Sequence, residues 1–186
     1  VLGASHIGTL EAMEERSLAP TMISGTSIGA LIAAFYAFGV STTRMKEIAI
    51  EMNWLDISSL SISKLGLLSN KKLGNIIEEE IGRPNVEDAD LPLGIVTTDL
   101  SSGEKVVFLE GDLITAVMAS SCIPGIFIPI ENNGRMLVDG VLVENVPISP
   151  LEKIGADFIV AADVNALRLY KKPDDMIEVV MNAMEI

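Results

Sequence analysis

The chain has 186 residues, of which 49% are hydrophobic and 21% charged, so intrinsic disorder is excluded as its main state. Its 26 acidic and 13 basic residues give a net charge of −13, which argues against nucleic-acid binding and against electrostatic docking on anionic lipid. One cysteine and one histidine exclude an internal disulfide and a structural zinc site of the usual ligands, so we expect a reducing, cytoplasmic location.

Helix-like and strand-like segments alternate along the chain without a long linker, which predicts one α/β domain over residues 1–186. The first half predicts a helix over 6–15, a strand over 22–24, a buried helix over 28–38 and a helix from the N-cap Ser41 to Met52. The apolar stretch 28–40 is too short to span a bilayer. Residues 54–69 are interpreted as a loop or lid, and Asn70 is expected to cap a helix that ends at residue 81.

The second half predicts a hairpin of strands 93–98 and 105–109 around the turn at 101–103. Asp112 is expected to cap a helix that runs through Ala119, and prolines 124 and 129 bracket an extended turn. A strand over 136–138, a helix over 147–154 and a buried strand over 158–162 follow. Pro173 opens a last helix. Because the chain opens at Val1, we expect that its natural N-terminus lies further upstream.

The sharpest signal is the run Gly25-Thr26-Ser27-Ile28-Gly29, between a predicted strand and a predicted helix. A strand that turns abruptly into a helix lifts a serine hydroxyl out of the packed chain, and flanking glycines permit crowding at the bend. The first amides of the helix can hold negative charge. Ser27 is therefore a candidate nucleophile, and the alternative is a serine that only caps the helix.

A nucleophilic serine needs a base, and the single histidine, His6, precedes Ser27, the reverse of the α/β-hydrolase order. The chymotrypsin order does place histidine first, but that fold is all-β, so His6 is interpreted as a packing or capping residue. Carboxylates remain, and three follow strand-like runs: Asp99, Asp139 and Asp163. Spacing does not choose among them. Gly140 and apolar neighbours favour Asp139, because desolvation would raise its pKa, whereas the other two are interpreted as cap or turn residues.

Five blocks of the sequence, in order from about Gly3 to Asp163, resemble the patatin-like phospholipase family. They are Gly3 with Ser5-His6-Ile7-Gly8, then Gly25-Thr26-Ser27-Ile28-Gly29-Ala30, then Ala119-Ser120-Ser121 with Ile123-Pro124, then Asp139-Gly140 with Asn145-Val146-Pro147, and Gly155-Ala156-Asp157. The resemblance implies a three-layer α/β/α sandwich with a mostly parallel central sheet, in a single patatin-like domain that extends beyond both ends of the sequence.

The resemblance also implies a serine-aspartate dyad. Ser27 takes the position of the nucleophile, flanked by Gly25 and Gly29 of the nucleophile elbow, and Asp139 takes that of the base, with Gly140 in its turn. The family's oxyanion hole comes from a glycine-rich loop before the first helix. In this sequence Gly3 matches the last glycine of that loop, with Ile28 as further backbone support. Leu2 replaces a basic residue, and Val141 replaces a small residue and is expected to narrow the site.

The implied activity is hydrolysis of fatty-acyl esters, as a phospholipase, lysophospholipase or carboxylesterase in lipid degradation, through an acyl-serine intermediate. No metal or other cofactor is called for. The expected partner is a lipid substrate, with transient contact with a membrane surface, and the oligomeric state is not indicated. Apolar residues between 57 and 68 are hypothesised to line an acyl slot or a lid, core packing being the alternative: Ile57, Leu60, Ile62, Leu65, Leu67 and Leu68.

Two other classes of protein compete with this interpretation. One is a non-catalytic lipid-binding or regulatory module of the same family. The other is a nucleotide-binding protein, but Thr9 stands where a phosphate-binding loop from Gly3 to Gly8 would need lysine. Cys122 is interpreted as a small buried residue and not as a second nucleophile.

Overall fold

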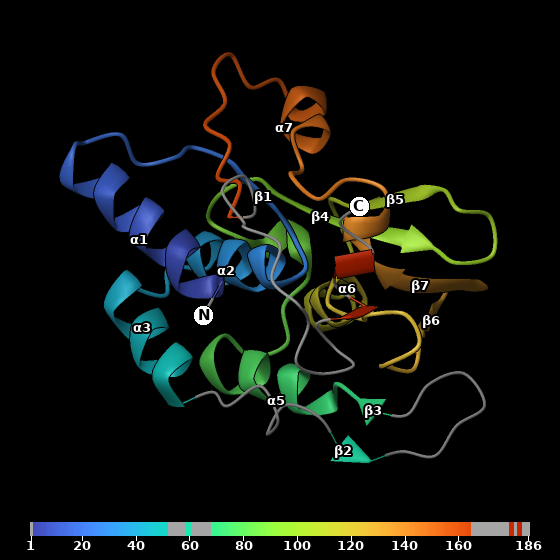
Figure 1. Cartoon of the computed structure of the whole chain (residues 1–186). Coiled ribbons are helices and arrows are strands. Elements are labelled where there is room, and N and C mark those ends of the chain that lie inside the picture. Colours follow the sequence, from blue (N-terminus) through green and yellow to red (C-terminus); the bar gives the residue numbers. More distant parts are fainter. Residues whose placement is uncertain (1, 52–58, 61–67, 165–178, 181, 184–186) are drawn as a thin grey trace.

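A computed structural model describes residues 2–51, 59–60, 68–164, 179–180 and 182–183 (Figure 1). The predicted lid over 54–69 lies mostly outside these residues, and so do Met52 and most of the helix that Pro173 was expected to open. The acyl-slot hypothesis therefore keeps two of its six positions, the backbone of Leu60 and the half-buried Leu68. No described helix has the length and apolar character needed to cross a membrane.

The described part of the central sheet is mixed. Its strands are β1 (Ile23–Thr26), β4 (Leu93–Asp99), β5 (Lys105–Phe108), β6 (Ile130–Asn132) and β7 (Arg135–Asp139). β1 pairs with β4 in parallel, whereas the β4–β5, β4–β7 and β6–β7 pairs are antiparallel. The α/β class is thus confirmed, and the expected parallel character holds at the β1–β4 pair. A separate antiparallel pair joins β2 (Ser59–Leu60) to β3 (Leu68–Ser69).

Helices lie on both faces of the sheet (Figure 1). One face carries α1 (Leu2–Glu15), α2 (Ile28–Ala37), α3 (Thr42–Glu51), α5 (Lys71–Glu80) and α6 (Leu113–Ser120), whose apolar side chains share one buried cluster with Ile95 of β4. Gly94, the preceding residue, lies on the opposite face, where a Cβ would come within 2.7 Å of Pro150 in α7 (Ser149–Ile154). These layers are the expected α/β/α arrangement.

The helix starts follow the predicted caps with one exception. The Ser41 hydroxyl accepts a hydrogen bond from the Arg44 N–H at 3.2 Å, and Asp112 Oδ1 accepts one from the Thr115 N–H at 2.7 Å. Asn70 precedes α5 but its side chain does not cap that helix. It is buried, and its Nδ2 donates to the Met118 carbonyl at 2.8 Å. This side chain therefore joins α5 to α6. Short 3₁₀ turns lie at Val86–Asp88 and Gly140–Leu142.

Two segments differ from the prediction. The buried strand expected over 158–162 is wrong, because no described strand pairs with this segment and Phe158 is 85% exposed. Apolar β-branched residues indicate a propensity for strand, but a strand also needs a partner edge. The turn expected between prolines 124 and 129 is present, but the β6–β7 hairpin that follows it was not predicted. Its turn places Asn133 and Gly134 at φ values of 50° and 75°, the two positive angles of a type I′ turn.

Candidate functional site

Ser27 lies at a sharp bend between β1 and α2. Its backbone has φ 55° and ψ −128°, which is rare for a residue with a side chain. A Cβ at Gly25 would fall 2.3 Å from the Gly29 carbonyl oxygen, so the bend requires glycine there. At Gly29 itself a Cβ would make an ordinary contact, 3.7 Å from His6 Nε2. The crowding expected at both glycines is therefore present at Gly25 alone of the two.

The side chains of Ser27 and Asp139 meet. Ser27 Oγ donates a hydrogen bond to Asp139 Oδ2 at 2.6 Å, although the two residues are 112 positions apart. Ser27 makes no side-chain cap on α2, which contradicts the alternative that it only caps the helix. The hydroxyl is thus directed away from the helix and toward a carboxylate.

The pairing of β4 explains this meeting. β5 pairs with Ile95–Thr98 of β4, β1 with residues 93–96 and β7 with residues 97–99. Both β1 and β7 overlap β5 along β4, so both must lie on the other edge of β4. β1 runs parallel to β4 and β7 antiparallel, so the two strands approach end to end and stop opposite the neighbouring residues Val96 and Thr97. Ser27 and Asp139 stand at these two ends.

Asp139 is buried completely and held from several sides. Its Oδ1 accepts the Val141 N–H at 3.0 Å, and its backbone carbonyl accepts the Thr98 hydroxyl at 2.8 Å. Gly140 packs so closely on β4 that a Cβ there would lie 2.3 Å from the Val96 carbonyl oxygen. Val141, which was expected to narrow the site, contributes its amide to the carboxylate and lines the neighbouring cavity.

Burial raises the pKa of Asp139 from its ordinary 3.8 to about 6. Desolvation is the main cause, and the hydrogen bonds from Ser27 and Val141 act in the opposite direction because they stabilise the ionised form. A carboxylate with this pKa is a stronger base than one in water, yet it is still mostly ionised at neutral pH. It can therefore accept a proton from the serine hydroxyl that it contacts.

The two residues expected to support an oxyanion lie beside each other. Gly3 is in the first turn of α1, where a Cβ would come 3.0 Å from Ile28 Cγ1. Ile28 is the first residue of α2, so its N–H has no acceptor within the helix. Gly3 and Gly8 both lie inside helix α1 and form no loop that could wrap a phosphate, which removes the nucleotide-binding alternative.

The other candidate residues have different surroundings, and the Ser27 hydroxyl donates to Asp139. Asp99 ends β4 and accepts the Ser101 N–H at 3.0 Å, as expected of a turn aspartate. His6 lies in α1, where burial lowers its pKa, and the carboxylate of Asp163 partly opposes that shift. Cys122 is buried and its thiol donates to the Ile128 carbonyl at 3.2 Å. Burial, together with Asp139, raises the pKa of this thiol to about 12, so it is not a nucleophile at neutral pH.

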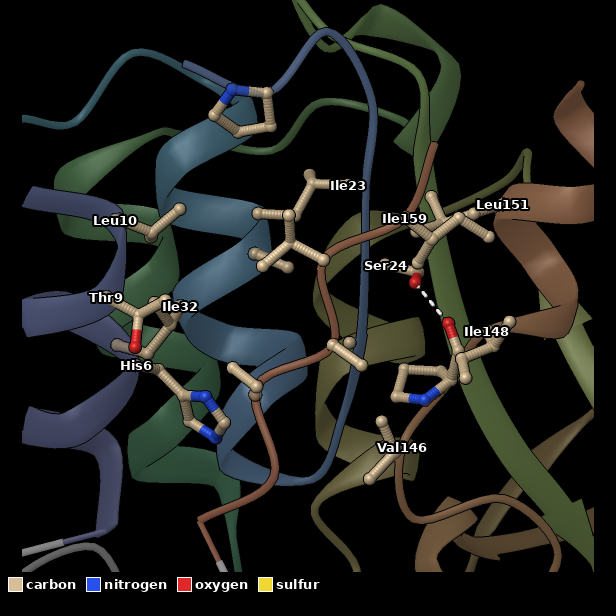
Figure 2. Close-up of a pocket in the computed structure, with 18 of the residues that line it drawn as sticks. His6, Thr9, Leu10, Ile23, Ser24, Ile32, Val146, Ile148, Leu151 and Ile159 are labelled. Carbon is tan, nitrogen blue, oxygen red and sulfur yellow. Dashed lines mark hydrogen bonds between the residues drawn. The ribbon is translucent and has the colours of Figure 1, made fainter. Parts of the chain in front are cut away.

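A cavity of about 360 Å³ extends from Ser27 along β1. Figure 2 shows its walls: His6, Thr9 and Leu10 from α1, Ile23 and Ser24 from β1, Val146, Ile148 and Leu151 from the α7 region, and Ile159. Among the described strands β1 pairs with β4 alone, so the N–H and C=O groups of its other edge have no partner strand in the described part of the chain. An alkyl chain along that edge would leave them without partners, so we do not assign the acyl chain to this cavity.

Sequence reasoning gave no role to Ser120 and Ser121, which contact the backbone of Ser27. Ser120 Oγ accepts the Ser27 N–H at 2.9 Å, and the Ser121 hydroxyl donates to the Ser27 carbonyl at 3.3 Å. Their signal in the sequence was the Ala119-Ser120-Ser121 block, which carried a resemblance without a chemical function. A hydroxyl that holds a distant backbone group leaves no pattern of spacing.

Comparison with known proteins gives one family and a consistent set of relatives. The family model for patatin-like phospholipases matches residues 1–152. An uncharacterized NTE family protein of Mycobacterium tuberculosis is 32% identical over 169 residues, which cover 88% of this chain and 46% of that protein. Neuropathy target esterase sws of Drosophila melanogaster is 28% identical over 88% of this chain and 12% of its own length. A lysophospholipase of Phaeosphaeria nodorum is 29% identical over 89% of this chain and 11% of its own length. The chain thus spans less than half the length of these relatives.

Proposed function

The chain belongs to the patatin-like phospholipase family, and on that premise we propose that it hydrolyses fatty-acyl esters of lipids, with lysophospholipids as the first substrate class to test. The observation that carries the proposal is the 2.6 Å hydrogen bond from Ser27 Oγ to the buried carboxylate of Asp139. The relatives named as an esterase and a lysophospholipase support the choice of substrate class.

The reaction would run through an acyl-serine intermediate. Ser27 Oγ attacks the ester carbonyl carbon while Asp139 takes the hydroxyl proton, and a tetrahedral oxyanion forms. The intermediate collapses, the bond to the alcohol breaks, and the leaving oxygen receives the proton from Asp139. Water then attacks the acyl-serine with Asp139 again as the base, and this step releases the fatty acid and restores the Ser27 hydroxyl.

The oxyanion needs backbone donors at the start of α2. The Ser27 N–H is already bonded to Ser120 Oγ, so it does not serve this purpose. The Ile28 N–H lies next to the nucleophile and at the positive end of the helix dipole, which supports it as one donor. Gly3 of α1 packs beside Ile28, and we propose that it supports the position of the Ile28 N–H that binds the oxyanion.

Release of fatty acid tests this function directly. The protein is incubated with lysophosphatidylcholine and, separately, with a p-nitrophenyl acyl ester, and the free acid or phenolate is measured. We expect turnover of both, because the two substrates share the acyl ester that Ser27 attacks. Binding of lysophosphatidylcholine micelles without release of acid would instead favour the non-catalytic lipid-binding module.

The pH profile should report Asp139. Because its pKa is raised to about 6, the carboxylate is protonated and inactive as a base below that pH and ionised above it. We expect kcat/KM for the p-nitrophenyl ester to rise about tenfold per pH unit below pH 6 and to level off above about pH 7. Circular dichroism at each pH verifies that the protein stays folded. A midpoint near 4 would contradict a buried carboxylate base.

A further inference from the structure

We propose that Ser120 is a positioning residue that sets the backbone of Ser27 for attack, and that residues 120–122 together hold both members of the dyad. The inference rests on the proposed function, since it assigns Ser120 a role in that same reaction. It concerns backbone groups of Ser27 and Asp139 that the hydrolysis mechanism itself does not use.

The Ser120 hydroxyl links the nucleophile to the central strand. Its Oγ accepts the Ser27 N–H at 2.9 Å and donates to the Val96 carbonyl of β4 at 2.7 Å. Ser120 is completely buried, so water cannot replace either bond. A serine near the end of a helix commonly bonds the carbonyl of its own preceding turn. The Ser120 hydroxyl instead donates to β4 and accepts the N–H of Ser27, which is 93 positions away in the chain.

Ser121 and Cys122, which follow Ser120, also bond the backbone of Ser27 and Asp139. The Ser121 hydroxyl donates to the Ser27 carbonyl at 3.3 Å, so both backbone groups of Ser27 are bonded to adjacent serines. The Cys122 carbonyl accepts the Asp139 N–H at 2.9 Å. Three consecutive residues therefore fix the nucleophile and the base relative to each other.

The conformation of Ser27 explains why such support is needed. A non-glycine residue at φ 55° is strained, and it stays there only when its surroundings determine its position. Without Ser120, the Ser27 N–H would lose its acceptor and the peptide could rotate. The Ser27 side chain would then move with its backbone, and its Oγ would shift relative to Asp139. A displacement of about 1 Å can cost roughly 100-fold in rate.

Replacement of Ser120 by alanine tests the proposal. We expect Ser120→Ala to lower kcat for the p-nitrophenyl ester and the rate of fluorophosphonate labelling by a similar factor, about 10- to 100-fold. KM and the midpoint of the pH profile near 6 should change little, because the substrate and Asp139 keep their contacts. Rates are compared at a temperature where circular dichroism shows each variant fully folded. Ser120→Thr keeps the hydroxyl and should recover part of the rate.

Thr97→Val is the matched control. Thr97 is also completely buried and also donates its hydroxyl to a strand carbonyl, that of Val106 at 3.0 Å. Its backbone lies opposite Asp139, but its hydroxyl bonds β5, on the other edge of β4 from Ser27 and Asp139. This variant should lose stability and keep the parent labelling rate. Equal rates for Ser120→Ala and the parent, or an equal loss in Thr97→Val, would overturn the positioning role.

Two further outcomes are separated by the same experiment. A parent protein that neither labels nor hydrolyses esters contradicts the proposed function and not the inference about Ser120 alone. Should Ser120→Ala fail to fold, Ser120→Cys carries the test, because sulfur is a weaker acceptor of the Ser27 N–H in a side chain of similar size. An unchanged labelling rate in that variant would likewise contradict the proposal.

Discussion

Ser27→Ala is expected to abolish fluorophosphonate labelling and to lower kcat for ester hydrolysis by at least about 10⁴-fold. The substitution removes the one oxygen that the mechanism uses as a nucleophile, whereas the bend itself is held by Gly25 and by the bonds to the Ser27 backbone. The fold should therefore persist, and thermal unfolding followed by circular dichroism can verify this. Mass spectrometry of the labelled parent should place the adduct on the peptide that contains Ser27.

The matched control is Ser102→Ala. Ser102 is exposed in the β4–β5 turn, where its hydroxyl accepts the Glu104 N–H at 3.2 Å. This variant loses a serine hydroxyl far from the bend and should label at the parent rate. An adduct found on another serine of the parent, or residual labelling of Ser27→Ala at the parent rate, would remove Ser27 from the role of nucleophile.

Asp139→Asn should separate activity from stability. We expect a loss of about 10³- to 10⁴-fold in kcat, because an amide cannot take the proton of Ser27. The shape of the side chain is kept, and its oxygen can still accept the Val141 N–H. At neutral pH the parent keeps an ionised carboxylate completely buried, which the raised pKa marks as unfavourable. The variant should therefore unfold at an equal or higher temperature, with a gain of about 1–3 kcal/mol in the free energy of unfolding.

The pH dependence of stability gives a second measurement of the same change. Asp139 has a higher pKa in the folded chain than the ordinary 3.8, so its contribution to stability is greatest when it is protonated, below about pH 4. That contribution decreases as the pH rises to about 6 and is constant above it. In Asp139→Asn this decrease between pH 4 and 6 should be absent.

Asp99→Asn is the control for this variant. Asp99 also ends a strand and is also nearly buried, but its carboxylate accepts the Ser101 N–H in a turn. It should keep the parent kcat. A large loss of activity in Asp99→Asn, together with a small one in Asp139→Asn, would reverse the assignment of the base.

The bend at Ser27 could be predicted from local sequence, whereas local sequence favoured Asp139 as its partner without determining that choice. The Gly25-Thr26-Ser27-Ile28-Gly29 run marks the place of the bend, although distant residues Ser120 and Ser121 also hold its backbone. Asp99, Asp139 and Asp163 all follow apolar runs, and the difference between them arises from how β1 and β7 share one edge of β4. That arrangement is long-range, and the resemblance to a family supplied what spacing did not.

Two other positions mark the limits of a single sequence. The apolar residues at 158–162 have strand propensity, but the structure gives this segment no strand partner among the described residues, and pairing cannot be read from propensity. The β6–β7 hairpin, in contrast, contains an Asn133-Gly134 pair, which is a strong signal for a type I′ turn. The prediction for this region relied on the prolines and did not use that signal.

The attachment of Ser27 and Asp139 to β4 has a consequence for heat inactivation. All seven residues of β4 are buried, and the Val96 carbonyl contacts both Ser120 and Gly140. Strands at the centre of a fold open last, because they come apart only when the whole molecule does. Esterase activity should then persist up to the melting transition. The loss of activity and the unfolding followed by circular dichroism should coincide when both are measured on one heating ramp.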